Sequence, residues 1–448
     1  MASIYLSTEV MDKITAIWKK CGHCLKGPNL IKTLLVGVCI VMVVQQISVS
    51  IHKLIDIPIT TYAHFDFNKT IAYPSVTFCR EPPYKFEKMM KYGLYSHPRF
   101  ISTWVDFNFS RNSLKQLWED ITYDEDEFFV HYSLNGLSDN LNLSSTLGFT
   151  SGLCFTLTPK VPINRATLAS GYAVTLQHNT DAVSTSSYPP GYHMHVHYSR
   201  EPYTEVEVYN GGLVDYIYVN TGETVDVKLT VDQYIKISDE EDPCTDAQNY
   251  SANSCTTQFV WDMVTAKVGC SGPWMKSDLP YCNNYSDMAE LISAYTYVYK
   301  NHEYTGCPRI CRSYLYNAFV TARQSFFRWD SSQRQWFIST GDTPLFTQVY
   351  IHFNSMMVSV YEERYNYDWN LFLSDLGGSV GFLLGLSVIG LMSILTNIWY
   401  MVKSSIVSKR MEKDSTSIKT SVTTTDLATI SDDHDYKNRF WNNNFLSY

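Results

Sequence analysis

Two long apolar runs frame the chain, and the residues between them follow mixed helical and alternating patterns. The first run extends from Leu34 to Ile51 and the second from Asn370 to Met401. At about 1.5 Å per residue, a helix of either length crosses a hydrocarbon core of ~30 Å. We therefore predict two membrane-spanning helices with a large domain between them.

Basic residues lie outside both runs, before the first and after the second. Because positively charged flanks usually stay inside, we expect both termini to be cytoplasmic. A cleavable signal peptide is the competing interpretation of the first run, but the run starts late and lacks a small-residue cleavage site. The expected segments are an N-terminal tail (1–32), a first membrane helix (33–53), an extracellular domain (54–369), a second membrane helix with a pore segment (370–402) and a disordered, Ser- and Thr-rich C-terminal tail (403–448).

Glycosylation sequons agree with this topology, because all of them lie between the two runs. Their acceptor residues are Asn68, Asn108, Asn142, Asn249 and Asn284. The net charge of −9 also concentrates between the runs. An acidic extracellular domain attracts cations, although solubility alone explains such a charge.

The pattern of the extracellular segment predicts an α+β domain. Alternating apolar and polar positions predict strands at 172–176, 193–198, 204–209, 224–237, 317–321 and 347–361. Helical spacing predicts helices at 113–121 and 288–299. We expect a central sheet, peripheral helices and a cysteine-rich lobe. The last strand leads almost directly into the second membrane helix, which would couple the domain to a gate.

Eight cysteines lie in the external segment, and an even number in an oxidising compartment predicts four disulfide bonds. They are Cys79, Cys154, Cys244, Cys255, Cys270, Cys282, Cys307 and Cys311. Residue order leaves about 105 pairings open. Cys21, Cys24 and Cys39 lie in the tail and the first helix, and we expect them to be reduced.

The second apolar run contains residues that a simple anchor does not need. Gly377, Gly381 and Gly385 recur every four residues, which on a helix gives a stripe of close approach. Packing of membrane helices through small residues explains such a stripe as well as an ion pathway does. Asp375 favours the pathway, because a carboxylate near the membrane is costly unless it faces water or a partner.

The segment from Asp375 to Ser387 resembles the second membrane segment of the degenerin/epithelial sodium channel family. Tyr73 to Cys79 is similar to the segment that follows that family's first helix, and the chain looks like a short insect pickpocket-type subunit. The resemblance implies a palm-and-thumb extracellular domain and a trimeric, sodium-permeable, amiloride-blocked channel in the plasma membrane. Its partners would be related subunits in a homo- or heterotrimer, with no cofactor, no metal and no nucleic acid.

The same resemblance assigns roles within the second helix. Gly385, Leu386 and Ser387 match the family's selectivity filter, where backbone oxygens face the ion. Ser374 matches the degenerin position, where a bulky side chain props the gate open, and Asp375 matches the acidic residue of the outer pore. The other pore-segment residues are Gly377, Gly378 and Gly381.

The resemblance also implies a disulfide pairing. The implied pairs are Cys79–Cys154, Cys244–Cys311, Cys255–Cys307 and Cys270–Cys282. Two further disulfide bonds of the family are missing here, each with both of its cysteines. Phe259 and Thr305 occupy the positions of one pair, and Val268 occupies one position of the other, whose partner would follow Cys282.

Two features of the family are missing. Its His-Gly dipeptide should fall between Thr15 and Lys20, and its acidic residue six positions after the filter serine is Ser393 here. Both positions bear on the inner pore and on gating. We hypothesise that this subunit conducts poorly alone and works as an accessory member of a heterotrimer.

Two other motifs carry weaker hypotheses. His193, His195 and His197 would share one face of a strand, as a metal or proton sensor requires, but solvated histidines are the more common case. Cys21-Gly22-His23-Cys24 spells a disulfide-isomerase motif without the preceding strand that this chemistry needs.

Three other protein classes compete with the channel hypothesis. A trimeric ATP-gated channel shares the two-helix plan but predicts an external lysine cluster. A two-pass receptor or adhesion protein explains the disulfides and sequons without a pore. An enzyme is disfavoured, because no nucleophile elbow, zinc motif or catalytic carboxylate pair stands out.

Overall fold

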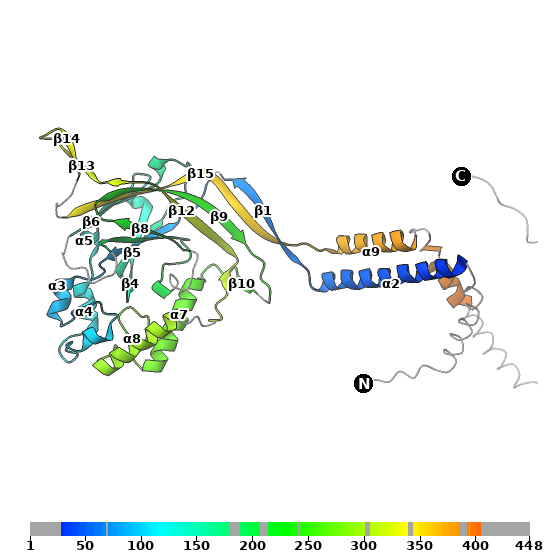
Figure 1. Cartoon of the computed structure of the whole chain (residues 1–448), viewed down its shortest axis with the longest axis horizontal. Coiled ribbons are helices and arrows are strands. Elements are labelled where there is room, and N and C mark those ends of the chain that lie inside the picture. The colour runs from blue at the N-terminus through cyan, green and yellow to red at the C-terminus, as the bar shows by residue number, and fades with distance from the viewer. Residues whose placement is uncertain are drawn as a thin grey trace, which may run out of the picture. The chain divides into compact units, whose positions relative to one another are not determined.

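The computed structural model describes residues 28–68, 70–179, 189–206, 214–240, 242–300, 305–338, 344–385, 390, 392–393 and 395–404. The chain divides into two compact units, Met1–Ile57 with Tyr367–Tyr448, and Pro58–Asn366. We call them the helical unit and the sheet unit. Within the described residues, the helical unit contains α2 (Pro28–Ile55) and α9 (Trp369–Leu384), and the sheet unit contains all the strands (Figure 1).

Two β-sheets form the framework of the sheet unit. The first has the order β12-β9-β15-β6-β3, with β1 beside β15. Its strands are β1 (Ile59–Phe67), β3 (Phe129–Leu134), β6 (Tyr172–His178), β9 (Glu223–Ile235), β12 (Arg312–Ser325) and β15 (Leu345–Tyr365). The second has the order β4-β5-β2-β7-β8. Its strands are β2 (Ser75–Glu81), β4 (Leu141–Gly148), β5 (Gly152–Pro159), β7 (Gly191–His197) and β8 (Val214–Asn220).

One hydrophobic core receives side chains from both sheets. Val225, Val227 and Leu229 alternate along β9 and are fully buried, and Val76 and Phe78 of β2 join the same cluster. Burying an aliphatic side chain of this size contributes ~1.5–3 kcal/mol. The sequence predicts one central sheet, whereas the structure has two large sheets. The apolar faces of the two sheets contribute to the same core, so each removes the apolar face of the other from water.

The long strand β15 changes partners along its length. Its first part pairs with β6 and its last part with β1, while β9 runs parallel to it on the other side. Tyr365 at its end pairs with Ile59 at the start of β1. Since α2 ends at Ile55 and α9 begins at Trp369, both helices of the helical unit connect through short segments to this one strand pair.

A second core lies among four helices of the sheet unit: α3 (Phe86–Lys91), α4 (Leu114–Ile121), α7 (Ala252–Val268) and α8 (Tyr285–Lys300). In α4, Leu114, Trp118 and Ile121 recur at helical spacing and are buried. Trp118 stacks on Trp104 at 5.8 Å and contacts Trp274 at 5.1 Å between ring centroids. The remaining short elements are α5 (Glu125–Phe128), β10 (Cys244–Thr245), β11 (Arg309–Ile310), β13 (Phe327–Asp330), β14 (Gln335–Ile338) and three 3-10 helices, η1 (Ile101–Trp104), η2 (Ser138–Asn140) and η3 (Leu168–Ser170).

Four disulfide bonds link the eight cysteines of the sheet unit. They are Cys79–Cys154, Cys244–Cys311, Cys255–Cys307 and Cys270–Cys282, the same pairs that the family resemblance implies. The first joins paired residues of β2 and β5, and the other three tie the segments around α7 and β11 together. Cys39 in α2 is a free thiol, and Cys21 and Cys24 lie outside the described residues.

The strand predicted at 204–209 is wrong in its described part. Glu205 and Val206 are helical, and the residues from 207 lie outside the described ones. The cause is the buried Glu205 carboxylate, which accepts hydrogen bonds from the backbone amides of Phe149, Thr150 and Ser151 at 2.7–2.9 Å. These charge-assisted bonds hold the segment at the β4–β5 turn, where it cannot join a sheet.

Candidate pore-lining segment and interhelical pocket

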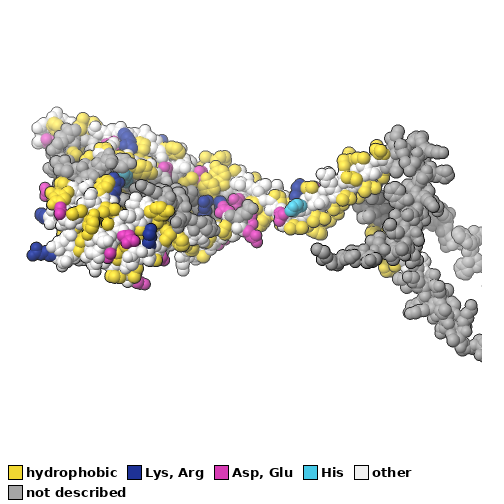
Figure 2. Space-filling view, turned by 60° about the horizontal axis from the view of Figure 1, so that its bottom comes forward, with side chains coloured by type: hydrophobic (Ala, Val, Ile, Leu, Met, Phe, Trp, Pro, Cys, Tyr) yellow, Lys and Arg dark blue, Asp and Glu magenta, His cyan; other side chains and the backbone are white. Residues whose placement is uncertain are grey.

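Helix α2 has the length and composition of a membrane span. Its segment Leu34–Ile55 has a mean hydropathy of 2.3 over 22 residues, and in the described part of the chain it is the one helix that meets both criteria. Leu35, Val41 and Val44 are 60–65% exposed, and Figure 2 shows the hydrophobic side chains along this unit. A large exposed apolar surface of this kind suits a lipid environment.

Helix α9 occupies only the first half of the second apolar run. The Asp368 carboxylate caps its start by accepting a hydrogen bond from the Leu371 amide at 2.7 Å. The helix ends at Leu384 because Gly385 adopts φ 63°, a left-handed conformation that favours glycine. Beyond Gly385, the described residues 390, 392–393 and 395–404 are helical. Where the sequence suggests one helix over 370–402, α9 stops within the run.

The predicted filter lies where α9 stops. Gly385 provides the terminating residue, while Leu386 and Ser387 lie outside the described residues. Gly377 and Gly381 remain in α9, so the predicted helical stripe of three glycines contains two. A Cβ atom added at Gly377 or Gly378 meets nothing within 4 Å. Within this chain, Gly377 and Gly378 are therefore not needed for close packing of α9 on α2.

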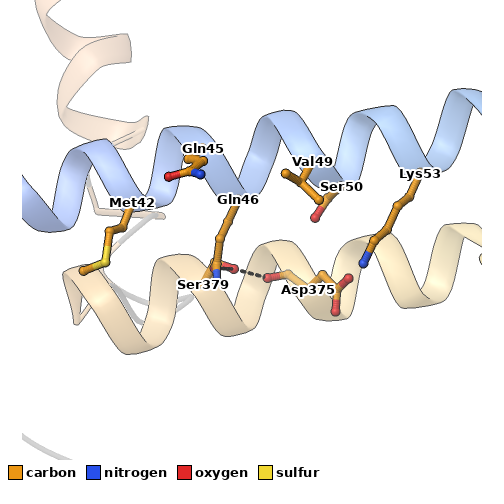
Figure 3. A pocket seen from close by; sticks show the side chains of 8 residues that line it. All are labelled: Met42, Gln45, Gln46, Val49, Ser50, Lys53, Asp375 and Ser379. Carbon is orange, nitrogen blue, oxygen red and sulfur yellow. Dashed lines mark hydrogen bonds between the residues drawn. The ribbon is translucent and has the colours of Figure 1, made fainter.

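The two helices contact each other through a different, partly polar face. The Ser379 hydroxyl forms a hydrogen bond with the side-chain oxygen of Gln46, drawn as the dashed line in Figure 3, and lies 2.7 Å from the Asp375 backbone oxygen. Val43 and Ser50 of α2 are buried on this side. Side-chain hydrogen bonds between membrane helices typically contribute about 1 kcal/mol.

A cavity of about 430 Å³ opens between α2 and α9. Its lining residues are Met42, Gln45, Gln46, Val49, Ser50, Lys53, Asp375 and Ser379 (Figure 3). One negative and one positive side chain thus share a wall in which six of the eight residues are polar or charged and two, Met42 and Val49, are apolar. A carboxylate near the membrane is costly unless it faces water or a partner, and this pocket gives Asp375 such surroundings.

Tyr367 connects the charged groups of this pocket. Its hydroxyl donates a hydrogen bond to Asp375 Oδ2 at 3.0 Å, and the Lys53 ammonium nitrogen lies 5.8 Å from the centroid of its ring. Ser374, the predicted degenerin position, precedes Asp375 on α9 and is exposed. Asp375 lies in the first half of α9, and Lys53 lies in the last turn of α2.

Gln46, Lys53, Tyr367 and Ser379 are not identified from the sequence. The signal available was the spacing of Gln46, Ser50 and Lys53, which places three polar groups on one face of an otherwise apolar helix. Polar residues at such positions in a membrane helix usually have a partner.

The three histidines of β7 share neighbours but differ in their hydrogen-bond partners and burial: the rings of His193 and His195 both contact Tyr216. His193 lies 3.1 Å from a Glu81 carboxylate oxygen, and His197 is bonded to Thr77 Oγ1 at 2.9 Å. His195 is buried, which lowers its pKa to about 3. Among the described residues, no group of three or more His, Cys, Asp or Glu side chains is arranged to hold a metal ion.

The five sequon asparagines are all exposed, as a glycosylation site requires, and their use stays a prediction. The Cys21 to Cys24 motif, and the tails before residue 28 and after residue 404, lie outside the described residues.

Comparison with known proteins identifies the family. The family model described as amiloride-sensitive sodium channel matches residues 23–396. No curated protein gives a significant match. A solved structure, the cryo-EM structure of a proton-activated chloride channel, is similar with a TM-score of 0.34 and 9% identity, over 83% of this chain and 96% of that one. That likeness is too low to support an argument. The family model spans both helices and the whole sheet unit, and the chain belongs to the amiloride-sensitive sodium channel family, a family of ion channels and not of enzymes.

Proposed function

We propose that this chain is a subunit of a trimeric, sodium-permeable channel of the plasma membrane that amiloride-type compounds block. The observation that carries the proposal is the end of α9 at Gly385 inside an apolar run. Helix ends leave backbone groups unpaired, and such groups are tolerated at membrane depth only where protein or a water-filled path surrounds them. Backbone oxygens near a helix break can replace the water around an ion.

In this proposal, α9 lines the pore and Gly385, Leu386 and Ser387 form the filter. Asp375 attracts cations at the outer end, and Ser374 is the position at which side-chain size sets the gate. Both termini are cytoplasmic and the sheet unit is extracellular. Movement of the strand pair β1 and β15 reaches both helices through the short connections at 55–59 and 365–369.

We further propose that the subunit is accessory and serves a sensory channel. The missing His-Gly dipeptide before α2 and the serine at 393 support a pore that needs related subunits. The pickpocket-like appearance of the sequence supports the sensory role.

The test is sodium current in cells that express the chain alone and together with related family subunits. We expect little current from the chain alone and a changed amplitude, selectivity or amiloride block in at least one combination. Surface labelling confirms that the chain reaches the membrane in each case. Surface-expressed protein that changes the current in none of the combinations contradicts the proposal.

A further inference from the structure

The pocket between α2 and α9 places a fixed positive charge beside the acidic residue of the proposed pore. Lys53 and Asp375 line the same cavity of about 430 Å³. Figure 3 shows the Lys53 side chain extending from α2 toward α9, next to Asp375. The two groups make no direct ion pair in the described residues, so the space between them is open to water or an ion.

Other contacts favour this position of Lys53. The ring of Tyr367 lies 5.8 Å from the ammonium nitrogen, and the Tyr367 hydroxyl is bonded to Asp375. Asp56, which immediately follows the end of α2, is the other acidic residue near Lys53 in sequence. It lies 3.0 Å from His52 on an exposed part of the helix, where it has its own partner. Asp375 is therefore the carboxylate that shares a cavity with Lys53.

The rest of the pocket wall suits a small hard cation. Ser50, Ser379 and Gln46 bring hydroxyl and amide oxygens to the cavity, and the Asp375 carboxylate supplies the negative charge. Oxygen atoms are the ligands that hard cations prefer. The cavity of about 430 Å³ has room for several waters, each of which occupies ≈30 Å³ in the liquid. A sodium ion with part of its hydration shell fits this space.

We propose that Lys53 is a tethered counter-ion of Asp375, which competes with sodium at this site and limits cation entry. This inference rests on the proposed function, and it gives the accessory role a physical cause. The alternative is that Lys53 simply extends from the end of α2 to the membrane–water interface, as lysines near helix ends often do. That role does not require a carboxylate in the same cavity, whereas the counter-ion role does. At an effective dielectric of about 20, a unit charge roughly 12 Å from a bound cation changes its affinity about tenfold, and a closer charge changes it more.

The first test uses Lys53→Met, which keeps the length of the side chain and removes its charge. In whichever subunit combination conducts, we expect the half-saturating sodium concentration to fall about tenfold. Lys53→Arg should restore the high value, since it keeps the charge. Lys115→Met is the matched control, because Lys115 is an exposed lysine of α4 whose partner is Glu119.

The second test needs no current. The full chain in detergent is heated in sodium chloride and in choline chloride at equal ionic strength. Sodium should protect Lys53→Met more than the unchanged protein, and adding Asp375→Asn should remove the gain. Lys53→Gln serves in the same way if the methionine variant does not fold.

The outcomes separate this inference from the channel proposal. If a conducting combination shows the same half-saturating sodium concentration with and without the Lys53 charge, and sodium gives Lys53→Met no added thermal protection, the inference is wrong while the channel proposal stands. Sodium protection of Lys53→Met without current in any combination supports the site and contradicts the channel. If neither the current nor the sodium protection responds to loss of the Lys53 charge, the inference is wrong.

Discussion

Replacing Gly385 by alanine tests the break at the end of α9. The residue has φ 63°, and a Cβ atom added there meets nothing within 4 Å. Steric clash with neighbours is therefore absent, and the cost is the left-handed backbone itself, about 1–2 kcal/mol for a residue other than glycine. This corresponds to a roughly 5- to 30-fold smaller population of the broken conformation relative to a continued helix.

Gly377 provides the matched control, since it also has open space around an added Cβ but lies within α9. Gly377→Ala should favour the helix by about 0.5–1 kcal/mol, the opposite sign from Gly385→Ala. Gly385→Asn should retain more function than Gly385→Ala, because asparagine tolerates the left-handed region.

The assay is amiloride-blocked sodium current with the permeability ratio of sodium to potassium, normalised to surface protein. We expect Gly385→Ala to reduce the current or the ratio, Gly385→Asn to reduce them less, and Gly377→Ala to leave the ratio close to that of the unchanged subunit. Equal ratios for Gly385→Ala and the unchanged subunit, with a loss in Gly377→Ala, would refute the assignment of the helix break to ion selection.

Two further predictions concern the sheet unit. Replacing Cys244 and Cys311 by serine opens a loop of 67 residues and should lower the free energy of unfolding by about 4 kcal/mol. Replacing Cys270 and Cys282, whose separation is 12, should lower it by about 3 kcal/mol. Thermal unfolding of the full chain in detergent measures both losses, and equal losses or the reverse order contradict the loop-entropy account. Burial lowers the pKa of His97 to about 4 from 6.5, so the unfolded chain binds a proton first and stability falls as the pH drops from 6.5 toward 4. The loss is about 2 kcal/mol at pH 5, and the pH dependence of unfolding should shrink by this amount in His97→Gln.

Strands with one buried face were predictable from the sequence. In β9 and β15, apolar residues alternate with polar ones because one face contacts the core, as Val225 and Val349 show. The predicted strands at 224–237 and 347–361 agree with these elements to within a few residues at each end. In the second sheet the sequence predicts only the strand at 193–198, which is β7. Strand β2 is buried on both faces and lacks the alternation, so its pattern does not indicate a strand.

Helix α7 was missed because its buried face is partly polar. Asn253, Thr257 and Thr265 are buried there, so apolar residues do not recur at helical spacing. Its ends carry recognisable signals, since the Ser251 side chain accepts a hydrogen bond from the Ser254 amide and Gly269 has φ 82°. Capping residues would have found this helix where periodicity did not.

Of the residues that line the interhelical pocket, the sequence singled out Asp375 of α9 and none from α2. Asp375 and the glycines stand out because they are unusual in an apolar run. Gln46 and Lys53 become meaningful only when α2 and α9 are neighbours, and Gln46 lies 333 positions from its partner Ser379. Such a contact is tertiary, and no local pattern specifies it.

Sodium current from cells that express this chain with related subunits tests the central claim most directly. Currents are compared with and without the chain, at matched surface levels, in sodium and after its replacement by a large organic cation. The account predicts a sodium-dependent, amiloride-blocked current whose amplitude or selectivity changes with the chain and with Gly385→Ala. A chain that reaches the surface, assembles with these subunits and alters no current in any combination would contradict it.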